Sequence, residues 1–459
     1  MQIRNVRLQI GLKGPGTWLD VVAARVADLA SSGAYPLRLA IVYLSDEGAV
    51  VEATVVRFDS DERALAPRLE EIELIGPQRK TRSLSPLVVV QVVPTGIRCE
   101  FGGYAGDACP ATNLLAAAAD FVVTHPNAVN ASELNEMAGN VLYVEGKSLD
   151  DFLLGRLGLA RTTANRVGTF IDPTGLAYLD DVENTLNAAR SVAGIDCGLH
   201  TILRREIGVR IEWTEAGCAV GTIQHPESLL EAVEKLIQEG ADAVGGVSVI
   251  HGVTSEMFHK HLDGLIPNPS GGVEAIITHL ISRIFRVPTA HAPLPYYQDV
   301  KERDVRNPRA SAEFISTPHY FCVLKGLSKA PALVPLADLD SAPPQALTVN
   351  NVGAVVMPAS CLGGIPALAA ELSGIPVIAV RENETILDVT NAKMRFENVI
   401  EVESYLEASG VLLALKQGIS LESLRRPMGR GHRIVVDSMK TALSDLDAAE
   451  RVAIHEQGA

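Results

Sequence analysis

The residues Leu87-Val-Val-Val-Gln-Val-Val93, with the loop after them, are the part of this 459-residue chain around which the rest is expected to fold. The run of valines predicts a buried strand, because a branched Cβ packs well on a pleated, covered surface. Pro94 ends this strand, and a loop with four glycines follows at residues 95–113. Two more apolar strands are expected at Phe121–Thr124 and Asn140–Val144. Continuously apolar strands are typical of a parallel sheet that is covered on both faces.

Short apolar strands alternate with helical segments along most of the chain, which predicts an α/β protein with a largely parallel sheet or sheets and flanking helices. Residues 1–84 differ, because a hairpin signal at Asp46-Glu-Gly48 and one amphipathic segment predict a small α+β module. We expect this module to be separable and to serve packing or subunit contact. A main α/β domain at 85–403, of one or two lobes, and a helical C-terminal region at 404–459 complete the expected organisation.

Composition excludes several classes of protein. A formal net charge of −15 argues against a surface for nucleic acid or anionic membranes. No apolar stretch approaches the roughly 20 residues of a membrane helix, and the N-terminus resembles a strand rather than a signal peptide. Six scattered cysteines without a close pair predict free thiols in a reducing compartment. We therefore expect a cytoplasmic homo-oligomer that binds neither nucleic acid nor membranes.

Five motifs carry a resemblance to a known family. They are Pro94–Asp107, Thr124–Ser132, Leu142–Gly146, Gly271–Ala275 and Gly374–Asn383. Together they resemble a bacterial, notably cyanobacterial, family that is catalogued only as a domain of unknown function. The resemblance implies a shared fold and a shared site. It transfers no catalytic role to any residue.

The glycine-rich loop is the first candidate site. Glycines let a backbone approach a ligand closely, and a following helix presents free N–H groups to an anion. The loop matches neither the dinucleotide nor the Walker pattern, so an ordinary tight turn is an equal alternative. Carboxylates flank the glycines and are candidates for acid and base or for holding a cation. The candidate residues are Glu100, Gly102, Gly103, Gly106 and Asp107.

Polar residues follow three of the expected strands, and the carboxyl ends of parallel strands meet at one edge of a sheet, where ligands bind. His125 is a candidate general base or substrate ligand, or a histidine bonded within its loop. Arg381 is expected to hold a substrate carboxylate through two hydrogen bonds. The strand ends that carry His125, the candidate catalytic Glu145 and Arg381–Asn383 are expected to converge on the glycine loop. The candidate substrate-binding residues of these ends are Asn127, Asn130, Arg381 and Asn383.

A second glycine motif precedes an apolar helix and suits either a bound phosphate or carboxylate, or ordinary helix capping. Its candidate substrate-binding residues are Ser270, Gly271, Gly272 and Glu274. We expect an anion here or at the start of the helix after Asn113. His279 lies further into the apolar helix, and we interpret it as a core histidine.

Cys361 follows a strand and precedes a helix, a position that lowers the pKa of a thiol. The segment Cys361–Leu372 with Gly374–Ile378 is similar to the second-cysteine segment of the aspartate/glutamate and hydantoin racemase superfamily. The first-cysteine segment of that superfamily has no counterpart here. Cys361 is therefore either a nucleophile or acid, or a buried structural thiol.

Three histidines, His251, His259 and His261, lie close in sequence. Metal ligation needs convergent side chains, and this spacing points them in different directions on a helix, so we expect no metal.

These observations predict a cofactor-independent enzyme that acts on a small anionic metabolite, a carboxylate or an amide, by acid-base or thiol chemistry. The alternative is a metabolite- or nucleotide-binding regulatory protein without turnover.

Overall fold

The computed structural model describes residues 1–12, 17–58, 86–131, 134–294, 307–315, 320–337, 339 and 342–431. Of the described residues, those up to 416 group into one unit and residues 417–431 belong to another. The predicted domain boundary at residue 84 and the tail after residue 431 lie outside the described residues.

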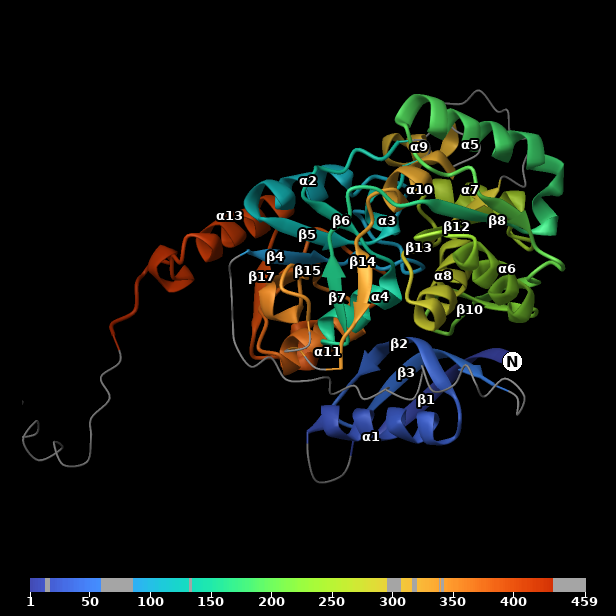
Figure 1. The fold of residues 1–459 in the computed structure, drawn as a ribbon. Helices are drawn as coiled ribbons and strands as arrows, with labels where there is room; N and C mark the ends of the chain where they lie inside the picture. The colour runs from blue at the N-terminus through green and yellow to red at the C-terminus, as the bar shows by residue number, and fades with distance from the viewer. Residues whose placement is uncertain are drawn as a thin grey trace, which may run out of the picture. The chain divides into compact units, whose positions relative to one another are not determined.

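The larger sheet has six parallel strands in the order β17-β16-β15-β4-β5-β6. Alternate residues of each strand face opposite sides, so both faces are apolar. One face packs on helices α2 and α13 and the other on α4 and α11 (Figure 1). These elements are β4 (Val88–Gln91), β5 (Phe121–Thr124), β6 (Val141–Tyr143), β15 (Val352–Pro358), β16 (Val377–Val380), β17 (Val399–Val402), α2 (Cys109–Ala118), α4 (Gly146–Leu153), α11 (Ile365–Leu372) and α13 (Tyr405–Lys416).

A second sheet has four parallel strands in the order β13-β12-β8-β9. Helices α6 and α8 cover one of its faces, and α5 and α10 cover the other. These elements are β8 (Val167–Ile171), β9 (His200–Ile202), β12 (Ala243–Val249), β13 (Thr289–Leu294), α5 (Leu179–Ala193), α6 (Pro226–Gln238), α8 (Gly271–Phe285) and α10 (Tyr320–Leu327). The two sheets confirm the predicted α/β class with largely parallel sheets and flanking helices.

The N-terminal residues form the predicted small α+β module, an antiparallel sheet of order β1-β3-β2 with one helix (Figure 1). Its elements are β1 (Gln2–Gly11), α1 (Trp18–Ser31), β2 (Tyr35–Leu44) and β3 (Gly48–Arg57). Strand β2 also bonds to the main domain, because the amide of Ile41 donates to the carbonyl oxygen of Gly363 at 2.9 Å. A Cβ at Gly363 would lie 2.1 Å from the carbonyl oxygen of Ile41, so this approach requires glycine.

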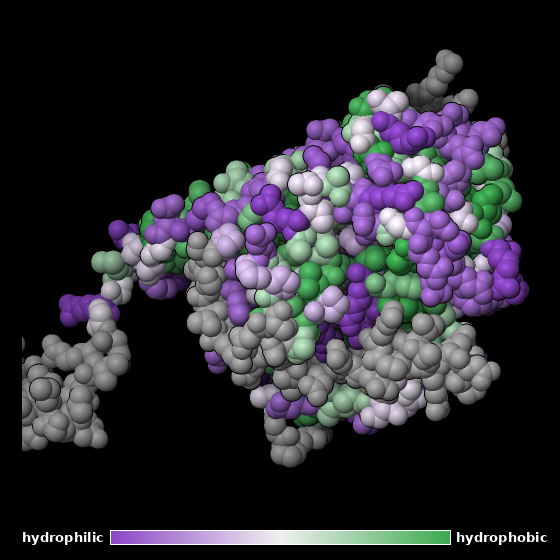
Figure 2. Space-filling model, viewed as in Figure 1, coloured by the Kyte–Doolittle hydropathy of each residue, from purple (hydrophilic) through white to green (hydrophobic). Residues whose placement is uncertain are grey.

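Two antiparallel pairs, β10-β11 and β7-β14, complete the strands of the described part of the chain. On the face shown in Figure 2, hydrophilic and apolar residues are interspersed, and apolar ones gather near the centre of the view, where Figure 1 places β7 and β14. The remaining elements are α3 (Pro126–Val129), β7 (Leu157–Ala160), β10 (Val209–Trp213), β11 (Ala219–Ile223), α7 (Ser255–Leu262), α9 (Ser311–Ile315), β14 (Ala332–Pro335) and α12 (Asn391–Met394).

Two helix starts differ from the sequence expectation. Helix α2 begins at Cys109, so Asn113 lies inside it and bonds to the backbone of Glu136 and Ala138 instead of preceding the first turn. Helix α11 begins at Ile365 with Gly364 as its cap, so Cys361 lies outside its first turn.

Candidate functional site

A cavity of about 370 Å³ lies among β2, the loops after β4, β5 and β6, helix α8, strand β13 and the start of α11. This volume is within the range of small-molecule sites. Among the residues predicted for the site, those that line it are His125, Asn127, Asn130, Glu145, Ser270, Gly271, Gly272, Glu274 and Cys361.

The buried Glu145 pairs with the partly buried His279 at this cavity. Glu145 caps helix α4, and its Oε2 accepts hydrogen bonds from the amides of Lys147 and Ser148 at 2.9 and 3.0 Å and from the Ser282 hydroxyl at 2.7 Å. Its Oε1 accepts a hydrogen bond from the Thr278 hydroxyl and bonds to Nδ1 of His279. Burial opposes ionisation of Glu145, but His279 and these donors lower its pKa to about 2.

This pairing decides which nitrogen of a neutral His279 ring carries the proton. Because the carboxylate holds Nδ1–H, the lone pair of a neutral imidazole lies on Nε2. No group of the described residues bonds to that Nε2, and the ring lines the cavity. A carboxylate that orients an imidazole in this way is the arrangement of a general base. Our interpretation of His279 as a core histidine is not retained.

The neutral ring of His125 carries its proton and its lone pair in a different arrangement. Its Nε2 accepts a hydrogen bond from the amide of Val93 at 2.9 Å, so the proton of the neutral ring lies on Nδ1. Burial lowers the pKa of His125 to about 4. The ring is therefore neutral at physiological pH, with its basic nitrogen already engaged. His125 can donate a hydrogen bond to a ligand, and it is poorly suited to the base role that we expected.

Asp150, on α4, is an acid that sequence reasoning missed. It lines the cavity, and burial raises its pKa to about 7, against a weaker opposite effect from Lys147. His279 and Glu145 both influence its charge, so the three groups are neighbours. A carboxyl group that titrates near neutral pH can give or take a proton.

The first turn of α8 brings a second carboxylate–histidine pair to the cavity. Oε2 of Glu274 lies 3.3 Å from Nδ1 of His291, whose Nε2 lies 2.9 Å from the Ser248 hydroxyl. Ser270 makes no side-chain capping bond. A Cβ at Gly271 or Gly272 would collide with Thr95 or with the backbone of Ala219, so chain packing explains both glycines.

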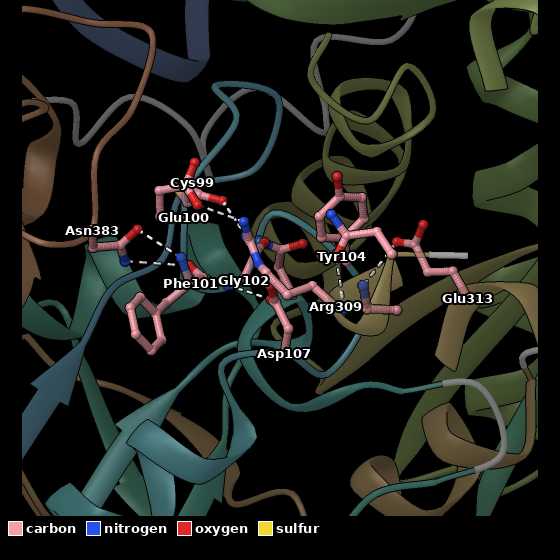
Figure 3. Close-up of polar contacts among 12 residues, drawn as sticks. Cys99, Glu100, Phe101, Gly102, Tyr104, Asp107, Arg309, Glu313 and Asn383 are labelled. Atoms are coloured by element: carbon pink, nitrogen blue, oxygen red, sulfur yellow. Dashed lines mark hydrogen bonds and ion pairs between the residues drawn. The ribbon is translucent and has the colours of Figure 1, made fainter. Parts of the chain in front are cut away.

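The glycine-rich loop does not line the cavity with its glycines or carboxylates. Arg309 lies between Glu100 and Asp107 and bonds to both, as Figure 3 shows. The amide of Gly102 donates to Asp107, whose pKa burial raises to about 6. The missing Cβ atoms of Gly102, Gly103 and Gly106 would lie 2.2, 2.1 and 2.1 Å from Val93, Cys99 and Ala131. These glycines serve internal packing, and we leave the loop's carboxylates and glycines out of the site.

Two predicted amides line the cavity but are already engaged. The Nδ2 of Asn127 donates to the carbonyl oxygens of Val93 and Gly102 at 3.1 Å each. Asn130 exchanges hydrogen bonds with the hydroxyl of Tyr143. Both amides shape the wall of the cavity.

Arg381 and Asn383 lie away from the cavity. The exposed Arg381 forms ion pairs with Glu401 and Glu403. Asn383 is buried and bonds to the backbone of Phe101 (Figure 3). It also donates to the Tyr405 hydroxyl. Neither joins the site, since neighbouring carboxylates or backbone groups hold both side chains.

Cys361 lines the cavity but lacks the environment of a reactive thiol. Its side chain is buried, and burial raises its pKa well above that of an ordinary thiol. The expected lowering by a helix start fails, because α11 begins four residues later. The thiol donates to the carbonyl oxygen of Pro358.

The three histidines near residue 255 do not converge. His261 is buried and bonds to Glu313, whereas Nδ1 of His259 bonds to the backbone of Ser255. Nowhere in the described ranges do three or more His, Cys, Asp or Glu side chains gather in a way that could hold a metal ion.

The sequence pattern of a family described as "Protein of unknown function (DUF3326)" matches residues 88–425. The chain belongs to this family. An uncharacterized lipoprotein from Synechococcus sp. (strain ATCC 27144 / PCC 6301 / SAUG 1402/1) is 33% identical over 346 residues, which cover 74% of this chain and 93% of that protein. No solved structure matches the chain. The predicted resemblance to a cyanobacterial family of unknown function is thus confirmed.

The name of this relative contradicts our prediction of a cytoplasmic protein, and we withdraw that prediction. The prediction relied on unpaired cysteines, and the structure shows why they are a weak guide. Five of the six thiols are buried and one is partly buried, so burial alone shields them from oxidants. Within the described ranges, we find no helix with the length and apolar character needed to cross a membrane.

Proposed function

We propose that the protein is a cofactor-independent enzyme that transfers protons on a small anionic metabolite bound in the 370 Å³ cavity. His279 acts as the general base through Nε2 and removes a proton from a carbon next to a carboxyl or amide group. Glu145 positions the ring and stabilises the imidazolium that forms. Asp150 is the second acid-base group.

The observation that carries this proposal is the Glu145–His279 pair. Four donors hold one buried carboxylate, which in turn holds Nδ1 of the His279 imidazole at the cavity. Hydrogen bonds from several donors fix the position of this carboxylate, and the carboxylate in turn fixes the imidazole. A base held in a fixed orientation is a more effective catalyst than a mobile base.

Two further features support the roles of the neighbouring groups. Asp150 has a pKa of about 7, so a substantial fraction is protonated at neutral pH and can deliver a proton. His125 presents a fixed Nδ1–H donor, which suits an oxygen on which negative charge develops. Thiol chemistry at Cys361 is not part of the proposal, because its raised pKa leaves little thiolate.

Deuterium exchange tests the proposal and does not require the product to be known. The protein is incubated in D2O with a panel of small carboxylic acids and their amides, and mass spectrometry records deuterium in the recovered compounds. We expect one or more compounds to gain deuterium at a carbon-bound position, and His279→Gln to abolish the gain.

The alternative is a metabolite- or nucleotide-binding regulatory protein without turnover. Thermal-shift measurements on the same panel, extended to nucleotides, separate the two. A compound that stabilises the protein but acquires no deuterium favours the binding protein. Deuterium gain that persists in His279→Gln would show that His279 is not the general base.

A further inference from the structure

The N-terminal module forms part of the cavity wall. Residues 38–41 of strand β2 line the cavity, and the hydrogen bond between Ile41 and Gly363 fixes that strand to the main domain. The matched family region begins at residue 88, so this wall comes from a part of the chain outside it.

Most of the carboxylates that line the cavity have a histidine partner, whereas the arginine that lines it has no carboxylate partner among the described residues. Three of the lining carboxylates have histidine partners: Glu145 with His279, Glu274 with His291 and Glu313 with His261. The cavity wall, as far as the structure describes it, contains one arginine or lysine side chain, that of Arg38.

Arg38 differs from these paired groups. The described residues offer it no carboxylate partner within 4.0 Å, and the thiol of Cys218 lies near it. A guanidinium carries five N–H donors in a planar fork, so most of them remain available to a ligand. The fork matches a carboxylate, which can accept two parallel hydrogen bonds from it.

We propose that Arg38 binds a carboxylate group of the substrate, so that the N-terminal module selects acids over the corresponding amides. The proposal rests on the proposed function, since both place the substrate in the same cavity. Proton transfer and substrate selection then come from different parts of the chain: the family region supplies His279 and Glu145, and the module supplies the anchor.

Binding of two matched pairs of probes tests the proposal: succinate with succinamide, and glutarate with glutaramide. Titration calorimetry measures the affinity of the full chain for each. The unsubstituted protein is expected to prefer the acids, and Arg38→Ala to weaken acid binding at least about tenfold with amide binding unchanged. Arg4→Ala is the control, because Arg4 is exposed on β1 of the same module and bonds to Gln2.

A second variant guards against loss of folding. Glu52 lies opposite Ala40 in the adjacent strand, and both of its carboxylate oxygens are buried without a hydrogen bond from the described residues. Removing a neighbouring cation can therefore destabilise the module. Arg38→Lys keeps the charge but loses the fork, and we expect several-fold weaker acid binding from a folded protein.

The outcomes separate this proposal from the proposed function. Equal affinity of the unsubstituted protein for acids and amides, or an acid preference retained in Arg38→Ala, overturns the role of Arg38 whether or not deuterium exchange occurs. An acid preference that Arg38→Ala removes supports that role, and if no probe or panel compound then gains deuterium, only the proposed enzyme activity fails.

Discussion

Glu145 and His279 lie 134 positions apart in the sequence, yet the carboxylate of one holds the Nδ1 of the other at the cavity. The contact joins the start of helix α4 to the middle of helix α8. Helix α4 packs on the six-stranded sheet and α8 on the four-stranded sheet, so the contact links the two. Base and positioning group therefore come from the two halves of the main domain.

Glu145→Gln should lower both stability and turnover. The substitution replaces a buried carboxylate by a neutral amide that cannot accept hydrogen bonds from the same five donors, and each buried donor left unsatisfied costs about 1–3 kcal/mol. Deuterium exchange should fall at least about 10²-fold, since a base without its orienting partner loses general-base efficiency. Urea denaturation and the exchange assay measure the two effects.

Glu274→Gln is the matched control for this prediction. Its contact with His291 is 3.3 Å long and its side chain is 18% exposed, against 2% for Glu145, so the loss of stability should be about 1 kcal/mol or less. An equal loss of stability in both variants would contradict the special status of the Glu145–His279 pair.

Asp150→Asn should change how stability depends on pH. The folded protein keeps the Asp150 proton up to about pH 7, whereas the unfolded chain loses it near 3.8. Raising the pH between these values therefore favours the unfolded chain. The resulting loss of folding stability reaches its full size above pH 7. The Asn variant lacks this cost, so at pH 8 it should be more stable than the unsubstituted protein by on the order of 4 kcal/mol.

The difference between the two proteins should shrink as the pH falls and vanish below 3.8, where Asp150 is protonated in both the folded and the unfolded state. Free energies of unfolding measured across this range check the prediction. Parallel curves for the two proteins would show that the carboxyl of Asp150 ionises normally.

Cys361 should behave as a structural thiol. Iodoacetamide should leave it unmodified in the native protein and label it after denaturation, because it is buried and its pKa is raised. Cys109, which is partly buried, is the internal comparison. Cys361→Ala should retain deuterium exchange within a few-fold. Rapid native labelling at Cys361 together with loss of exchange would restore the nucleophile hypothesis.

Gly363→Ala should weaken the attachment of the N-terminal module. The added Cβ would lie 2.1 Å from the carbonyl oxygen of Ile41, and forcing such a contact costs typically about 1–3 kcal/mol. Gly410→Ala, with nothing within 4 Å of the added Cβ, is the control and should not destabilise the protein. Limited proteolysis should release the module faster only from the first variant.

The sequence predicted the sheets well because their signal is local. Valine-rich runs such as β4 and β5 are buried on both faces. Because both faces are covered, apolar residues follow one another along the strand, and this pattern is visible in the sequence. Strand β5 ends at Thr124 as predicted, whereas β4 ends at Gln91 and β6 at Tyr143, short of the predicted Val93 and Val144. The residues after β5 and β6 bring His125 and Glu145 to one cavity.

The missed residues depend on contacts that no local pattern contains. His279 lies in an apolar helix, and only the distant Glu145 distinguishes it from a core histidine. Asp150 carries no local signal of a role, and its raised pKa comes from burial that the fold creates. Arg381 does follow a strand end as predicted, but carboxylates on and after the next strand engage it.

Deuterium exchange by two histidine variants tests the account most directly. His279→Gln should bind the substrate found in the screen but lose exchange by at least about 10²-fold, because the base is gone. His125→Gln should weaken binding and retain measurable exchange, because it removes a hydrogen-bond donor and leaves the base. Exchange that survives in folded His279→Gln and disappears in folded His125→Gln would contradict the assignment of His279 as the base.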